Sequence, residues 1–126
     1  MFTKFAQTVN LNQFIMARYT RKQIEAMPNP KNLAGADLAQ LDLRDVNLRN
    51  ANLSNADLNY ACLVCADLRS ANLTNACLDG AMLEGADLSD ADLSDGSLRD
   101  ADLSNADMSG TKLSGADMSG VIGYED

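Results

Sequence analysis

The sequence lacks histidine and tryptophan and has only three tyrosine and three phenylalanine residues among its 126 positions. The absence of histidine excludes imidazole acid–base catalysis and His-ligated metals. So few aromatic side chains also argue against a stacking platform for single-stranded nucleic acid. A chain of this length suffices for one domain, but not for a catalytic domain beside a separate binding domain. These absences together argue against an enzyme.

Basic residues are few and unevenly distributed, and the net charge is −8. Residues 1–30 carry four basic side chains and one acidic one, residues 31–78 carry four and five, and residues 79–126 carry two and twelve. Binding to a nucleic-acid backbone or to an anionic membrane surface requires clustered Lys and Arg. We therefore expect neither direct nucleic-acid binding nor membrane binding.

Long apolar segments are also absent. No run approaches the roughly 20 residues of a membrane span, and residues 1–20 lack the apolar segment and small-residue cleavage site of a signal peptide. The three cysteines are an odd number, which fits a reducing compartment better than a disulfide-stapled secreted protein. These features predict a cytoplasmic protein.

Four residue types supply half of the chain, namely 18 Ala, 18 Leu, 15 Asp and 12 Asn. Residues 31–120 divide without a gap into eighteen pentapeptides whose central residue is Leu in sixteen and Met in two. The first position is Ala in thirteen repeats, and the second is Asp or Asn in thirteen. The exceptions at the first position are Lys31, Leu41, Val46, Gly96 and Thr111. The composition is therefore explained by a regular five-residue repeat and not by low complexity.

A period of five matches neither an α-helix nor a β-strand, so neither would keep the Leu on one face over ninety residues. A turn in every pentapeptide explains the period, because the chain then winds into a solenoid with Leu inside and polar residues outside. Asn, Asp, Gly and Ser at the corners have suitable turn chemistry. The sequence predicts an all-β solenoid.

The tandem pattern A(D/N)LXX, as in Ala51-Asn52-Leu53-Ser54-Asn55-Ala56-Asp57-Leu58, resembles the pentapeptide repeat protein family, and in particular its short, loop-free cyanobacterial members. The resemblance implies a right-handed quadrilateral β-helix with four pentapeptides per coil, here about four and a half coils. It also implies an inward stack that includes Leu53, Leu58, Leu63, Leu68, Leu73 and Leu78.

Four-sided winding aligns residues that are twenty apart, so Asp67, Asp87 and Asp107 form one outward column, with Asp90 nearby. One interpretation is that each second-position Asp or Asn caps its own turn through its side chain. The other is that these four carboxylates form an acidic stripe that binds a basic partner. Arg44, Arg49 and Arg69 are the only basic outward cluster of the repeats, and we expect them to pair with Asp42, Asp45 and Asp67.

Cys62-Leu63-Val64-Cys65 is formally a CxxC motif, with Cys77 downstream. No second CxxC and no histidine completes a tetrahedral metal set, and a four-sided coil places Cys77 on another side from Cys62. We therefore predict no metal site, no cofactor and no catalytic residue. We interpret the cysteines as small residues tolerated at turn positions.

The two ends do not follow the repeat. Thr20 to Gln23 form a capping-box pattern that predicts a short helix near 21–27, and we expect a second helix around 11–18. We expect residues 1–30 to plug the first coil; the alternative is a partner-binding arm with Arg18, Arg21 and Lys22 outward. At the other end, residues 121–126 form a short tail in which Val121, Ile122 and Tyr124 cover the last coil. That limited cover predicts a monomer or a weak end-to-end dimer.

Members of the family that occupy the DNA-binding saddle of type II topoisomerases act as acidic DNA mimics, which the acidic second half would suit. The short rod, the absence of a loop insertion and the absence of Phe from the central positions count against it. The sequence therefore predicts a non-enzymatic structural or protein-interaction module whose partner is an unidentified protein. DNA mimicry toward gyrase is the alternative.

Overall fold

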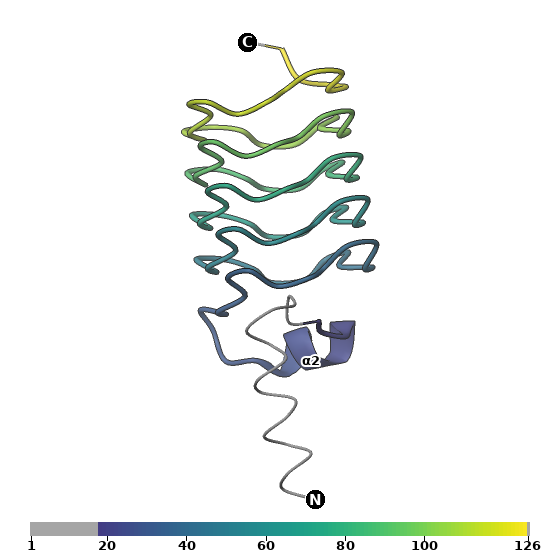
Figure 1. Cartoon of the computed structure of the whole chain (residues 1–126), viewed down its shortest axis with the longest axis vertical. Coiled ribbons are helices and arrows are strands. Elements are labelled where there is room, and N and C mark those ends of the chain that lie inside the picture. Colours follow the sequence, from purple (N-terminus) through teal and green to yellow (C-terminus); the bar gives the residue numbers. More distant parts are fainter. Residues whose placement is uncertain (1–17, 126) are drawn as a thin grey trace, which may run out of the picture.

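The computed structural model describes residues 18–125 as a rod of stacked coils, with one short α-helix beside the first coil and the C-terminus at the opposite end (Figure 1). Within that range the α-helix is α2, Arg21–Ala26. No run of consecutive strand residues occurs in residues 18–125, because each side of a coil contributes one residue to a parallel β-bridge.

The bridges join residues that are twenty apart, so that one coil takes four pentapeptides. Asn32 pairs with Asn52, Asn52 with Asn72, and Asn72 with Asp92, all in parallel. Two hydrogen bonds hold each such step: the N–H of Leu33 donates to the carbonyl of Asn52 at 2.7 Å, and the N–H of Asn52 donates to the carbonyl of Lys31 at 2.8 Å. The regular spacing keeps every position of the repeat in its own column.

Each corner is a turn closed by a backbone hydrogen bond, such as that from the N–H of Ala36 to the carbonyl of Leu33 at 3.1 Å. The fifth residue of all eighteen repeats has a positive φ, between 57° and 74°. The fifth residue of a repeat is the third residue of the turn. A turn with positive φ at its third residue and not at its second is a type II turn, which favours Gly and Asn at that third residue. Fourteen of the eighteen fifth residues are Gly, Asn or Asp, which tolerate this conformation best.

The core consists of the inward Leu and Ala columns. Leu53, Leu58, Leu63, Leu68, Leu73 and Leu78 are fully buried. Ala at the first position leaves room for the Leu side chains in the narrow cross-section. Of the five exceptions, Leu41 and Thr111 are only partly buried, whereas Val46 is buried. Burial weakens at the C-terminal end, where Met108, Leu113 and Met118 are partly exposed.

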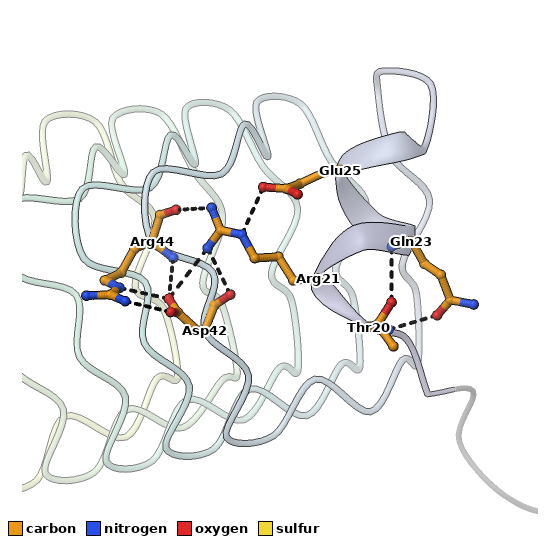
Figure 2. Close-up of polar contacts among 6 residues, drawn as sticks. All are labelled: Thr20, Arg21, Gln23, Glu25, Asp42 and Arg44. Atoms are coloured by element: carbon orange, nitrogen blue, oxygen red, sulfur yellow. Dashed lines mark hydrogen bonds and ion pairs between the residues drawn. The ribbon is translucent and has the colours of Figure 1, made fainter.

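Helix α2 covers the first coil. The Thr20 hydroxyl accepts from the N–H of Gln23 at 3.2 Å, and the Gln23 side chain accepts from the N–H of Thr20 at 2.8 Å, as a capping box requires (Figure 2). The helix ends at Ala26, one residue before the expected limit, because Met27 precedes Pro28 and is extended. Its one buried residue, Ile24, packs on the core.

On one side of the first coil, Arg21 supplies the hydrogen-bond donors that a preceding coil would otherwise provide. In the next coil, the carbonyls of Cys62 and Val64 accept the backbone N–H groups of Leu43 and Asp45. The equivalent carbonyls of the first coil, those of Asp42 and Arg44, accept instead from Nη1 and Nη2 of Arg21 at 3.0 and 2.9 Å (Figure 2). A guanidinium group therefore satisfies an exposed β-edge.

Arg18 caps a second side of the first coil. Its backbone forms a parallel bridge with Asp37, and its Nη2 donates to the carbonyl of Ala39 at 3.2 Å. Arg18 and Arg21 thus contact the first coil of the solenoid. The alternative of a partner-binding arm would have required both side chains to point outward. The rest of the helix suggested for 11–18 lies outside the described residues, and Arg18 itself is not helical.

The C-terminal tail continues the solenoid by one side. Ile122 bridges Asp102 and remains 57% exposed, whereas Val121 and Tyr124 pack partly against the core. The expectation that Ile122 covers the last coil is therefore wrong, because its carbonyl accepts from the N–H of Leu103 and its side chain faces outward. In residues 18–125 no helix is long and apolar enough to span a membrane.

Candidate interaction surfaces

The four sides of the rod present columns of second-position side chains. Asp67 bridges Asp87, and Asp87 bridges Asp107, so these three lie one above another on one side. Neighbouring coils of a β-structure lie about 4.8 Å apart. With Asp90 at the adjoining corner, these residues form what we call the acidic stripe.

Turn capping is the structural role of the second-position residues. At all thirteen Asp or Asn positions, side-chain Oδ1 accepts from the backbone N–H two residues later, over 2.9 to 3.4 Å. This confirms the turn-capping interpretation. Capping uses one oxygen of a carboxylate and leaves its charge on the surface, so it does not by itself decide whether the stripe binds a partner.

Arg69 partly neutralises the acidic stripe. Its Nη2 lies 2.6 Å from Oδ2 of Asp67, and its Nε lies 3.7 Å from Oδ2 of Asp87. The hydrogen bond from Arg69 holds the pKa of Asp67 below its ordinary value. The hydrogen bond from Ser109 lowers the pKa of Asp107 in the same direction. In residues 18–125, Asp90 and Asp107 have no ion-pair partner, so the free charge lies toward the C-terminal end.

The other expected ion pairs form only in part. Arg44 pairs with Asp42 at 2.7 Å, and this hydrogen-bonded contact lowers the pKa of Asp42 to about 2. Asp45 and Arg49 form no ion pair within the described part of the chain. The basic cluster is thus largely satisfied within the rod and offers little to an acidic ligand.

One network was not foreseen from the sequence. Cys77 and Ser97 occupy second positions where no Asp or Asn caps the turn, and side chains from the preceding coil replace the cap. Oδ1 of Asn59 accepts from the N–H of Asp79 at 2.9 Å, and Oδ1 of Asp79 accepts from the N–H of Arg99 at 3.0 Å. Asp79 also bonds the Ser97 hydroxyl and the Arg99 guanidinium. The sequence signal is an Asn or Asp at the fourth position of a repeat, twenty residues before the fourth residue of a repeat that lacks Asp or Asn at its second position.

Burial raises the pKa of Asp79, but its bonds to Ser97 and Arg99 outweigh that effect and leave the pKa below its ordinary value. The network is therefore a structural brace in its charged form. Nothing in it resembles an acid–base pair poised near neutral pH.

The three cysteines are free thiols. Cys62 bridges Met82 and Cys77 bridges Ser97, so the two lie on different sides as expected. Burial raises the pKa of the Cys77 thiol, and the nearby Asp57 and Asp79 add to that effect, which makes the thiol less reactive. No group of three or more metal-ligating side chains occurs among residues 18–125.

The fold defines a class of solenoid proteins in which a four-sided β-helix is built from five-residue repeats. The family model for pentapeptide repeats matches residues 32–64, 51–90 and 86–122. The chain therefore belongs to the pentapeptide repeat family. A comparison with curated proteins gave no match.

Solved structures of the same family resemble the chain. A pentapeptide repeat protein from the thylakoid lumen of Arabidopsis thaliana is 27% identical over 86% of this chain and 75% of its own, with a TM-score of 0.74. A pentapeptide repeat protein from the cyanobacterium Nostoc is 35% identical over 77% of each chain, with a TM-score of 0.46. The Arabidopsis structure and the family match together imply that the coils of this chain wind as a right-handed β-helix.

Proposed function

We propose that the protein is a non-enzymatic interaction module of the cytoplasm, whose acidic stripe binds a basic surface of a protein partner. The supporting observation is the stacking of Asp67, Asp87 and Asp107 in one column beside Asp90. Aligned like charges create a directional field that a scattered distribution of the same charge does not. Arg69 pairs with Asp67 at 2.6 Å and lies 3.7 Å from Asp87, so Asp90 and Asp107, together with the more loosely paired Asp87, carry the interaction.

Substitution of Asp by Asn separates charge from turn capping, because Asn retains the Oδ1 acceptor. The stripe variant is D87N/D90N/D107N. The matched control, D92N/D95N/D117N, removes three charges of the same acidic half from other sides of the rod. Affinity capture followed by mass spectrometry is expected to recover a partner with the wild type and the control, and to lose it with the stripe variant. Equal recovery with both variants would remove the proposal.

Mimicry of DNA toward gyrase is the second candidate function. It is favoured by the eleven acidic residues of 79–125, a segment that forms one half of a narrow rod of coils (Figure 1). A supercoiling assay with added protein tests it: inhibition by micromolar protein that is lost in the stripe variant supports mimicry. Full supercoiling at that concentration dismisses it and leaves the interaction module standing.

A further inference from the structure

One side of the rod carries an apolar surface that the repeat does not require. Tyr60, Met82 and Ile122 are the large hydrophobic side chains that are exposed within residues 18–125, and all three belong to this side or to the corner that leads into it. Tyr60 and Met82 lie on adjoining coils with Cys62, Val64 and Cys65, which are at least partly exposed. We call these five residues the apolar patch.

Two glycines give the apolar patch its shape. The Tyr60 ring lies across Gly80 of the next coil, where a Cβ would collide with the Cδ1 and Cε1 atoms of the ring. The Cys65 thiol lies similarly against Gly85, with its sulfur 3.3 Å from the position of a Cβ. Because glycine leaves this space, both side chains reach the next coil at the two corners that flank Met82.

The patch lies where two stacked turns lack the side-chain cap that most turns of the rod have. At the second positions Cys62 and Met82, no side chain within residues 18–125 accepts the N–H of Val64 or Glu84. On the neighbouring side, by contrast, Asn59 and Asp79 replace the missing caps. Two stacked turns thus lack a stabilising bond and carry outward apolar groups that the fold does not require.

Charge surrounds the patch asymmetrically. Toward the N-terminal end, Asp42 and Arg44 neutralise each other at 2.7 Å. Toward the C-terminal end, Glu84, Asp100 and Asp102 form no ion pair within residues 18–125. An apolar centre with an acidic flank is complementary to an apolar side chain that has Lys or Arg beside it.

We propose that the apolar patch seats an apolar side chain of a basic amphipathic helix, whose Lys or Arg residues meet Glu84 and Asp102. This inference rests on the proposed function, because it assumes that the rod binds a protein, and it adds an anchor beside the acidic stripe. The patch and the stripe lie on adjacent sides that meet at the corner of Cys65 and Gly85. A helix that lies over that corner contacts both surfaces.

The test uses the full chain and an amphipathic peptide of Leu and Lys, titrated into isotopically labelled protein and followed by amide NMR. Shifts are expected at residues 60–65 and 80–85. A peptide with Gln in place of Leu, which has the same charge, is expected not to shift those amides. The variant C62N/M82N restores two turn caps and removes the centre of the patch, so its Tm is expected to rise while its affinity for the peptide falls about tenfold.

Lys112 supplies the matched control, because it is another second position without a capping side chain and lies on a different side of the rod. K112N is expected to gain stability without loss of binding. Unchanged affinity in C62N/M82N overturns the inference, and so do shifts of the patch amides with protein concentration alone, which would make a second copy the occupant. If the stripe variant alone loses the peptide, the inference is wrong while the proposed function stands.

Discussion

Removal of one inward leucine tests whether the core is a rigid stack. Leu73 is fully buried, and the backbone ladders fix the coils on both sides of it: its own N–H donates to Asp92 at 2.7 Å, and the N–H of Leu53 donates to Asn72 at 2.7 Å. Leu73→Ala removes the equivalent of three methylene groups, or about 2.4 kcal/mol of transfer free energy at about 0.8 kcal/mol each. The ladders prevent the coils from closing the cavity, so we expect a total loss of about 3–5 kcal/mol.

Leu113 offers a control in the same column, two coils later. It is partly exposed at the C-terminal end, so its truncation leaves no enclosed cavity. We expect Leu113→Ala to cost about 1–2 kcal/mol, less than the full burial of a Leu is worth. Urea unfolding followed by circular dichroism gives both values. Equal losses for the two variants would refute the picture of a rigid central stack with a loose end.

The repeat could be predicted from the sequence because it is local and periodic. Each pentapeptide carries its own turn chemistry, such as Leu53 inward and Asn55 at positive φ, and eighteen copies reinforce one register. The thirteen second-position caps follow from the same logic, because an Asp or Asn side chain reaches the N–H two residues away without help from distant parts of the chain.

Features that depend on the path of the chain could not be predicted in this way. The guanidinium of Arg21 meets the carbonyls of Asp42 and Arg44 only because the non-repeating helix places it there. The brace from Asn59 to Asp79 requires that twenty residues make one coil, which the resemblance implied but no single repeat contains. The apolar patch likewise emerges only when Tyr60 and Met82 are brought to neighbouring coils.

Three further predictions concern the cap, the turns and acid stability. Arg21→Ala leaves two edge carbonyls without their donors, so we expect the free energy of unfolding in urea to fall by about 1–3 kcal/mol. Arg21→Lys is expected to retain only part of this stability, because a lysine ammonium cannot present two donors in the fixed geometry of a guanidinium. Asp57→Asn keeps the bond to the N–H of Asn59 at 2.9 Å and is expected to leave stability nearly unchanged, whereas Asp57→Ala costs about 1 kcal/mol in the same assay. Asp67 and Asp79 have pKa values lowered by folding, so the unfolded chain binds protons first as pH falls. Stability is then fully present above about pH 5 and declines as pH falls through about 4 toward the folded pKa values, which urea midpoints at pH 7, 4 and 3 will measure; an unchanged midpoint at pH 3 would contradict it.

We propose that position on the rod, and not net charge alone, gives the acidic half its function. The dissociation constant of a captured partner, measured by calorimetry for the wild type and both triple variants, tests this most directly. We expect D87N/D90N/D107N to bind about tenfold more weakly or worse, and D92N/D95N/D117N to bind within about twofold of the wild type. Equal weakening of the two variants would show that the charge acts without regard to the column that carries it, and would rule out a specific role for the acidic stripe.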